Sequence, residues 1–109
     1  MTDKIVVLTT CGSQEEAQRI ARALVEQRLA ACVNFTAPVQ SVYWWQGGIE
    51  QEQEVILIVK SRRELFPKLA ETLRALHSYE VPELIALPIV DGLAAYLDWM
   101  DRELASGTT

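Results

Sequence analysis

The sequence feature that most constrains the fold is a pair of long β-type runs within residues 32–60. The runs read CVNFTAPVQSVYWW and IEQEQEVILIVK, and the letters QGG separate them. Two such runs joined by a glycine turn predict a β-hairpin. The second run has about 12 residues and a length of about 40 Å, whereas a compact domain of this size is about 35 Å across. We therefore expect the hairpin to extend beyond its own domain.

The composition of the hairpin indicates what its overhanging part does. With the turn centred on the two glycines, Trp45 pairs with Glu50 and Tyr43 with Glu52, so aromatic rings lie beside polar groups. Trp44 and Trp45 point to opposite faces, and an isolated two-stranded ribbon is marginal in water. Two interpretations are open: a surface hairpin with one tryptophan in its own core, or an arm that packs on a neighbouring subunit. We favour the arm, because exposed strand edges pair readily with another chain.

Length and charge exclude several classes of protein. The 109 residues suffice for one domain, which we expect to span residues 1–109. A net charge of −5 and a pI of about 4.8 argue against nucleic-acid or membrane partners, since both require basic surfaces. No stretch approaches the roughly 20 apolar residues of a membrane span, and the first residues lack the apolar region of a signal peptide. We therefore predict a cytoplasmic protein in which Cys11 and Cys32 are reduced.

Local patterns before and within the hairpin predict its neighbours. Residues 5–10 form a short β-branched run that is typical of a central strand. Ser13 and Glu16 match a capping box at the start of a helix. The apolar face of this helix comprises Ala17, Ile20, Ala21, Leu24, Val25 and Leu29. Pro38 interrupts the first arm of the hairpin, which predicts an edge position or a bulge there.

The second half of the chain continues with two helices and a strand. Pro67 is tolerated only in the first turn of a helix, so a second helix begins near Glu64. Residues 84–90 predict a last strand, with an edge position or an irregular end at Pro88. Asp91 then caps a third helix. The apolar stripe of this helix comprises Leu93, Leu97, Met100 and Leu104.

The order of these elements predicts an α+β fold. A strand–helix–strand–strand–helix–strand order builds a ferredoxin-like βαββαβ core, with a four-stranded antiparallel sheet and two helices on one face. The long hairpin and the additional C-terminal helix are extensions of this core. The other face of the sheet must then be covered by the last helix or by other subunits.

Five stretches of the chain together resemble one known family. They are LAAC at residues 29–32, SVYWWQG at 41–47, Glu54 with Lys60, HSYEVPE at 77–83, and YLDW at 96–99. Their order and spacing are similar to those of the CutA divalent-cation tolerance proteins, and the resemblance covers nearly the whole chain. It implies a ferredoxin-like homotrimer, similar to PII signalling proteins, in which long hairpins wrap neighbouring subunits. It also implies a protein that binds divalent metal ions, copper above all, in the response to metal ions. We expect neither enzymatic activity nor an obligatory cofactor.

His77, the only histidine, is the first candidate metal ligand. An imidazole with a thiolate or a carboxylate suits Cu(II) or Zn(II), and the resemblance implies metal binding in this segment, so Cys11 and Glu83 complete the set. Several relatives carry a proposed copper-binding cysteine where this chain has Thr9, and Cys11 is its expected substitute. The alternative is that His77 stabilises the C-terminus of its helix. One histidine cannot form a tight site alone, so further ligands must converge from this chain or from other subunits.

A second candidate site combines aromatic and charged side chains. We expect an inter-subunit pocket or trimer contacts from Tyr43, Trp44, Trp45, Glu54, Lys60, Tyr79, Tyr96 and Trp99. An aromatic pocket with convergent polar groups is the usual small-ligand site. Glu50, Glu52 and Glu54 alternate along one strand, so they share a face that collects cations. The alternative is a solvated face or an ion pair between subunits.

Two other functions compete with the metal-binding trimer. A PII-like signalling trimer binds an anionic small molecule in the cleft between subunits, which requires a basic, glycine-rich loop. The QGG turn is short, and Arg62 with Arg63 is the only basic pair. An acylphosphatase-like enzyme requires an arginine in the first loop, and residues 9–13 contain none. We therefore rank the metal-binding trimer first.

Overall fold

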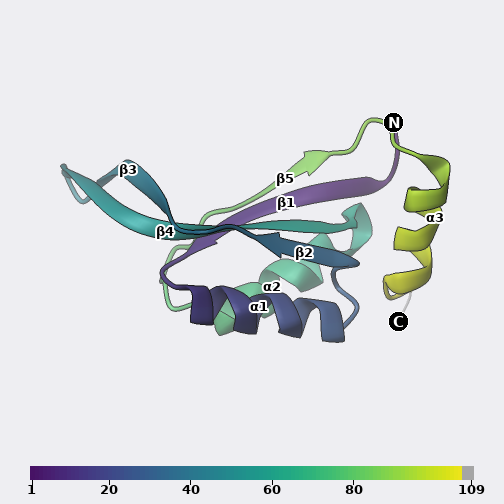
Figure 1. Cartoon of the computed structure of the whole chain (residues 1–109), viewed down its shortest axis with the longest axis horizontal. Helices are drawn as coiled ribbons and strands as arrows, with labels where there is room; N and C mark the ends of the chain where they lie inside the picture. The colour runs from purple at the N-terminus through teal and green to yellow at the C-terminus, as the bar shows by residue number, and fades with distance from the viewer. Residues whose placement is uncertain (107–109) are drawn as a thin grey trace.

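The computed structural model describes residues 1–106, in which five strands form one antiparallel sheet and α1 and α2 cover one of its faces (Figure 1). The strands are β1 (Lys4–Cys11), β2 (Cys32–Phe35), β3 (Val39–Trp45), β4 (Gly48–Arg62) and β5 (Leu84–Pro88). The helical elements are α1 (Gln14–Glu26), a 3₁₀ turn (Arg63–Leu65), α2 (Phe66–Leu76) and α3 (Ala94–Glu103). The sheet order is β2-β4-β1-β5, and β3 also pairs with β4. This order confirms the predicted ferredoxin-like α+β core. Residues 107–109 of the predicted domain lie outside the described range.

The hairpin of β3 and β4 projects from the domain, as predicted. β4 has 15 residues, and the molecule measures 44 × 26 × 24 Å. Figure 1 shows the hairpin forming one end of the longest axis, away from the helices. Trp44 is 73% exposed and Trp45 is 48% exposed. The interpretation with one tryptophan in the core of its own domain is therefore wrong.

The turn of the hairpin differs from the predicted one. Gln46 and Gly47 both have positive φ angles, of 50° and 85°, which is the pattern of a two-residue type I′ turn. Trp45 therefore pairs with Gly48, and Tyr43 pairs with Glu50. The predicted register was wrong by two residues. Because side chains alternate with a period of two, this shift leaves every side chain on its predicted face.

A bulge interrupts the first arm of the hairpin at the predicted place. Phe35 pairs with Leu57, and Val39 pairs with Glu54. Four residues of the first arm thus match three of β4, so one residue is extra. Pro38 lies within this segment and has no N–H group for the ladder, which explains why regular pairing stops there.

The hydrophobic core lies between the sheet and α1 with α2. Val7 of β1 and Leu57 of β4 are fully buried on this side. Ser13 caps α1 as predicted, because its Oγ accepts a hydrogen bond from the backbone N–H of Glu16 at 3.1 Å. Val25 was predicted to lie on the buried apolar face of α1, but its side chain is exposed, so this part of the prediction is wrong. The second helical segment starts with the 3₁₀ turn, close to the predicted Glu64.

Helix α3 closes the end of the molecule opposite the hairpin (Figure 1). Met100 and Leu104 are buried against Leu65. The predicted cap at Asp91 is wrong, since the helix starts at Ala94 and Leu93 occupies the N-cap position. The carboxylate of Asp91 instead accepts a hydrogen bond from the N–H of Gly92 at 2.9 Å, one residue away.

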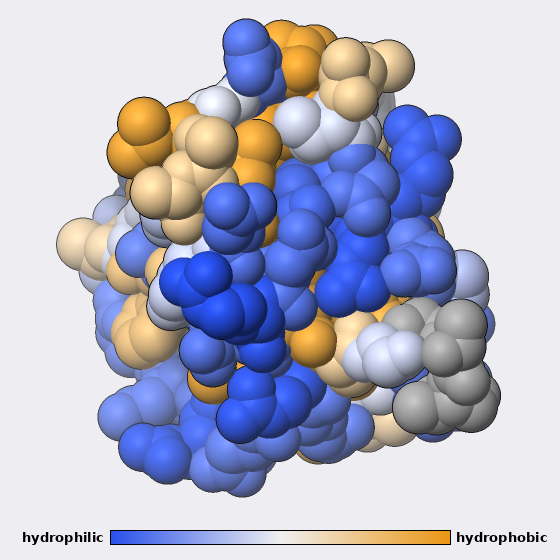
Figure 2. Space-filling model, turned by 90° about the vertical axis from the view of Figure 1, so that its right-hand side faces the viewer, coloured by the Kyte–Doolittle hydropathy of each residue, from blue (hydrophilic) through white to orange (hydrophobic). Residues whose placement is uncertain are grey.

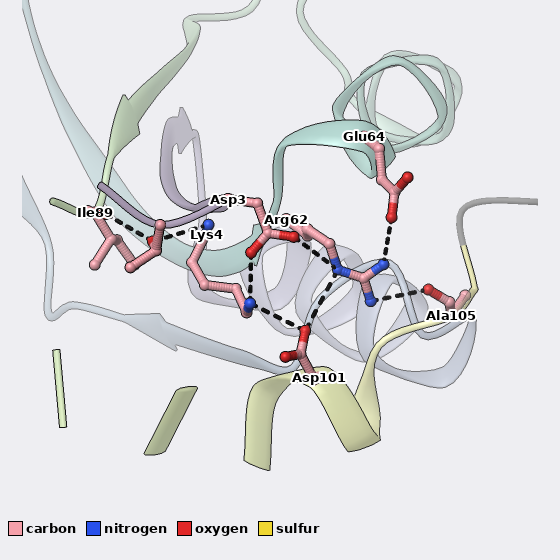
Figure 3. A network of polar contacts seen from close by, with 8 residues as sticks. Asp3, Lys4, Arg62, Glu64, Ile89, Asp101 and Ala105 are labelled. Atoms are coloured by element: carbon pink, nitrogen blue, oxygen red, sulfur yellow. Dashed lines mark hydrogen bonds and ion pairs between the residues drawn. The ribbon is translucent and has the colours of Figure 1, made fainter. Parts of the chain in front are cut away.

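Two nearly buried cations attach α3 to the end of the sheet (Figure 3). The Nζ of Lys4 lies 2.6 Å from the carboxylate of Asp3 and 3.0 Å from that of Asp101 in α3. Arg62 forms an ion pair of 2.7 Å with Glu64 and lies 3.7 Å from Asp101. These contacts hold α3 at the sheet end, so it does not cover the open face of the sheet.

The open face of the sheet carries exposed apolar side chains. Ile85 and Leu87 of β5 are 50% and 48% exposed, and they pair with Leu8 and Val6 of β1. Figure 2 looks at the α3 end and shows hydrophobic residues gathered along the upper side, where β5 lies in Figure 1. Exposed apolar patches of this kind mark interaction surfaces. Of the two predicted covers for this face, the last helix is therefore excluded, since α3 is held at the sheet end.

Thr9 provides a test of the core. It is fully buried in β1, and within residues 1–106 its Oγ1 has no hydrogen-bond partner. We expect Thr9→Val to raise the free energy of unfolding by about 1 kcal/mol, because it removes a buried hydroxyl that forms no bond. Denaturant titration at a single protein concentration measures the effect. Thr10→Val on the half-buried side serves as the control, and a destabilised Thr9→Val protein contradicts the prediction.

Candidate functional site

A cleft of about 750 Å³ opens where the hairpin leaves the domain. Strands β3 and β4 form one wall, and residues 79–83 after α2 form the other. Three aromatic side chains line it: Tyr43, Trp45 and Tyr79. The volume lies in the range of small-molecule sites in proteins, so this cleft is the candidate functional site.

The bulge in the first arm places two of these aromatic residues. Cys32 of β2 pairs with Lys60 on the open face, which assigns even-numbered residues of the arm to that face. One extra residue reverses the alternation, so the odd-numbered Tyr43 and Trp45 reach the open face in β3. Without the bulge, both rings would point away from the cleft.

Five carboxylates also line the cleft. Glu50, Glu52 and Glu54 alternate along β4 and therefore share the cleft face. Glu80 and Glu83 come from the opposite wall. Within the described part of the chain, no lysine, arginine or histidine belongs to the lining. The cleft is consequently strongly anionic and attracts cations.

Glu54 and Tyr79 join the two walls. The phenol of Tyr79 donates a hydrogen bond of 3.0 Å to a carboxylate oxygen of Glu54. Glu54 is only 8% exposed. Burial, and then the hydrogen bond to this anion, raise the pKa of Tyr79 well above its usual value. Loss of water contacts and the nearby carboxylates of Glu52, Glu54 and Glu50 also raise the pKa of Tyr43.

His77 lies behind the cleft and uses both ring nitrogens. Its Nδ1 accepts a hydrogen bond from the backbone N–H of Tyr79 at 3.0 Å, so the proton of a neutral ring is on Nε2. Nε2 donates to the carbonyl oxygen of Thr10 at 2.6 Å. The side chain has no exposed surface. His77 therefore fixes the start of the cleft wall to the end of β1.

Glu16 is a buried member of this region whose role the sequence did not predict. The capping box assigned it to the start of α1, but its carboxylate accepts bonds from the N–H and the hydroxyl of Ser78, at 2.8 and 3.0 Å. It also lies 3.7 Å from Nδ1 of His77. Burial alone raises the pKa of Glu16, but the hydrogen bonds from Ser78 and from the N–H of Gly12 lower it below the usual value. The partner is 62 residues away, so no local pattern reveals it.

The three predicted metal ligands do not converge within one chain. Cys11 is fully buried, its thiol donates to the carbonyl of Ser13 at 3.4 Å, and burial raises its pKa. The nitrogens of His77 are engaged, whereas Glu83 is exposed in the cleft. In the part of the chain that the structure describes, no three cysteine, histidine or acidic side chains are arranged to hold a metal ion.

The predicted inter-subunit residues divide into groups. Tyr43, Trp45, Glu54 and Tyr79 meet in the cleft. Trp44 pairs with Ile49 on the other face of the hairpin. Lys60 donates to Oδ1 of Asn34 and lies 3.9 Å from Sγ of Cys32 on the open sheet face. Tyr96 and Trp99 lie on α3 with ring centres 5.5 Å apart, at the opposite end of the molecule.

The ferredoxin-like topology, the overhanging hairpin and the cleft at its base define a small α+β protein with an anionic cleft. The sequence profile of a family described as CutA1 divalent ion tolerance protein matches residues 5–103. The chain belongs to this family.

Individual relatives agree with the family match. A divalent-cation tolerance protein CutA from Thermus thermophilus is 54% identical over 95 residues, which are 87% of this chain and 92% of that protein. Protein CutA 1, chloroplastic, from Oryza sativa is 44% identical over 96 residues, 88% of this chain and 54% of that protein, so the chain spans about half of that relative. The solved structure of the Thermus thermophilus divalent cation tolerance protein matches with a TM-score of 0.92 at 50% identity. It covers 94% of this chain and 99% of that one.

Titration of Tyr79 tests the geometry of the cleft. Because its pKa is raised from 10.0 in the folded protein, its contribution to stability is complete below pH 10 and is lost as the pH rises through the folded-state pKa. In an ultraviolet titration, we expect Tyr79→Phe to remove the last tyrosine ionisation of the folded protein. Glu54→Gln is expected to move this step to lower pH. An unchanged final step in both variants contradicts the bond between Tyr79 and Glu54.

Proposed function

We propose that the protein is a trimer that binds divalent metal ions, copper above all, in the response to metal ions. The observation that carries the proposal is the anionic cleft, with five glutamates and no basic residue in its described lining. The net charge of −5 adds to the attraction for cations. Membership of a family described by divalent ion tolerance supports the same function.

The same charges disfavour the PII-like alternative. An anionic small molecule bound in this cleft would face Glu50, Glu52 and Glu54 without a lysine or arginine among the described lining residues. Close like charges are repulsive, and the two-residue Gln46-Gly47 turn is too short to form a glycine-rich phosphate-binding loop. A cation is the better match for this surface.

Copper binding, as we propose it, requires ligands from more than one subunit. His77 supplies an imidazole, which suits copper, while Cys11 supplies a thiol and Glu83 an exposed carboxylate. Since no three such groups converge in residues 1–106 of one chain, a second subunit must complete the set. The ring of His77 must also give up its bond to Thr10 or to Tyr79. Copper binding is then expected to depend on assembly.

Assembly through the open sheet face is the corresponding structural proposal. Ile85 and Leu87 are half exposed there. The hairpin adds a second group of exposed apolar side chains, since Trp44 and Ile49 pair on the face opposite the cleft and are both exposed. Burying such patches between subunits stabilises an oligomer. Three copies are the number that the family resemblance implies.

We further propose a non-enzymatic role in the cytoplasm. The description of the family refers to tolerance of divalent ions and names no chemical reaction. Cys11 and Cys32 are both free, which is typical of a reducing compartment. Within residues 1–106, no helix has the length and apolar character to cross a membrane. Fractionation of cells that produce the protein tests this placement, because recovery with the membranes or outside the cell opposes it.

Calorimetric titration of metal ions tests the metal-binding proposal. We expect Cu(II) to bind the wild-type assembly with saturable, micromolar or tighter affinity, and more tightly than Zn(II) or Ni(II). His77→Ala is expected to abolish this binding, and Cys11→Ser to weaken it. Cys32→Ser is the matched control, since it removes the other free thiol and is expected to bind copper normally. Equal, weak and non-saturating heats in all four proteins would exclude these ligands.

A charged substitution on the open face tests the trimer. We expect wild-type protein to sediment as a trimer and Leu87→Glu to sediment as a monomer, because the new carboxylate lies within the proposed contact. Val25→Glu places the same charge at a similarly exposed aliphatic position on α1, and its trimer is expected to persist. A monomeric wild type, or a trimeric Leu87→Glu, would contradict the proposed contact.

A further inference from the structure

The segment between β5 and α3 contains the one Asp-Gly pair of the sequence, Asp91-Gly92. Figure 1 shows this segment passing the N-terminus before it enters α3. Both residues are exposed and lie outside the helices and strands. The carboxylate of Asp91 accepts a hydrogen bond of 2.9 Å from the N–H of Gly92, the next residue of the chain. The side chain is therefore folded over its own following peptide group instead of capping α3.

This arrangement brings two reactive groups together. The backbone nitrogen of Gly92 and the side-chain carbonyl carbon of Asp91 are the two atoms that join when an aspartate forms a succinimide ring. The hydrogen bond from this nitrogen to an oxygen on that carbon keeps the two atoms close, and proximity raises the rate of an intramolecular reaction. Gly92 has no Cβ that would obstruct the approach of its nitrogen. Because both residues are exposed, water also reaches the site.

The other aspartates of the chain lack this arrangement. Asp98 and Asp101 lie inside α3, where helical hydrogen bonds hold the N–H groups that follow them. Asp3 is followed by Lys4, whose N–H donates a hydrogen bond of 3.0 Å to a threonine hydroxyl. In all three cases the following residue also carries a long or bulky side chain. Asp91 is consequently the aspartate at which ring formation meets the least resistance.

We propose that Asp91 is a site of spontaneous covalent modification, at which the chain converts to isoaspartate through a succinimide. In the first step the nitrogen of Gly92 bonds to Cγ of Asp91, and the hydroxyl of the protonated carboxyl leaves with the amide proton as water. In the second step a water molecule opens the ring. Opening at Cγ restores aspartate, whereas opening at the main-chain carbonyl routes the chain through the former side chain. The two steps need no oxidant, reductant or other reactant.

The fixed ends of the segment give this modification a structural consequence. The carbonyl of Ile89 accepts hydrogen bonds from the N–H and the hydroxyl of Thr2, and its N–H donates to the carbonyl of Lys4 at 3.0 Å. Lys4 in turn holds Asp101 of α3 (Figure 3). At the other end, the carbonyl of Leu93 accepts the first two hydrogen bonds of α3. Isoaspartate adds one atom to the main chain between these anchors, so the attachment of α3 to the sheet end is loosened.

The test is prolonged incubation of the full-length protein, in its native assembly, at physiological temperature in water enriched in heavy oxygen. After return to ordinary water, peptide mapping by mass spectrometry locates the label, because ring opening adds one oxygen atom from the solvent. We expect label and isoaspartate at residue 91 to exceed those at Asp3, Asp98 and Asp101 at least about tenfold. A methyltransferase specific for isoaspartyl carboxylates, supplied with S-adenosylmethionine, is expected to methylate the aged protein but not the fresh one.

Variants at the same position separate ring formation from other damage. Asp91→Glu keeps the charge but would have to form a larger ring, so it is expected to acquire neither label nor isomer. Asp91→Asn reaches the same succinimide with loss of ammonia and is expected to convert faster than wild type. Amide hydrogen exchange in α3 is expected to be faster in the aged wild type, to slow again after methyltransferase repair, and to stay slow in aged Asp91→Glu. Absence of label at residue 91, equal label at all four aspartates, or unchanged exchange in the isomerised protein would overturn the proposal.

Discussion

The structure depends on continuous hydrogen-bond pairing along β4. This strand pairs with β1 and β2 along its second half, and with β3 along its first half. The change of partner follows its sequence: residues 55–59 read VILIV and lie in the sheet, whereas residues 50–54 read EQEQE and lie in the arm. Since a single strand serves both, the arm is anchored by the core that buries Val55, Leu57 and Val59. The cleft lies at the point where this strand passes from apolar to acidic.

The opposing strand contributes the second constraint, which is the bulge near Pro38. Alternation along β4 is unbroken, so its glutamates and its open-face residues Ile56 and Ile58 share one side. The extra residue in the first arm reverses alternation there and brings Tyr43 to the acidic side while Trp44 takes the other side. The hairpin thereby has one face with glutamates and aromatic rings, and a second face on which the pair Trp44–Ile49 follows glutamine-containing pairs. The two faces of the ribbon consequently differ in charge.

Much of this arrangement is readable from local sequence, and the errors have physical causes. The order of elements, the overhang and the break near Pro38 follow from propensity, strand length and the missing N–H of proline. The predicted register of the hairpin was wrong by two residues because Gln46 adopts a positive φ angle. This conformation is uncommon for a residue other than glycine, so the sequence does not indicate it. Glu54 and Tyr79 were predicted as members of one site, but the partner of Glu16 was not. Contacts such as Glu16 with Ser78 depend on how α1 and the end of α2 pack, which no local pattern encodes.

The segment after α2 links the proposed copper ligand to the cleft. His77 holds the backbone N–H of Tyr79 through Nδ1, and the phenol of Tyr79 holds Glu54. A metal ion at Nδ1 would take the lone pair that this N–H requires, and one at Nε2 would break the bond to Thr10 instead. Coordination through Nδ1 therefore loosens the residue that orients the buried carboxylate, whereas coordination through Nε2 leaves it in place. The choice of ring nitrogen therefore decides whether a metal ion at His77 would alter the positions of Tyr79 and Glu54 in the cleft.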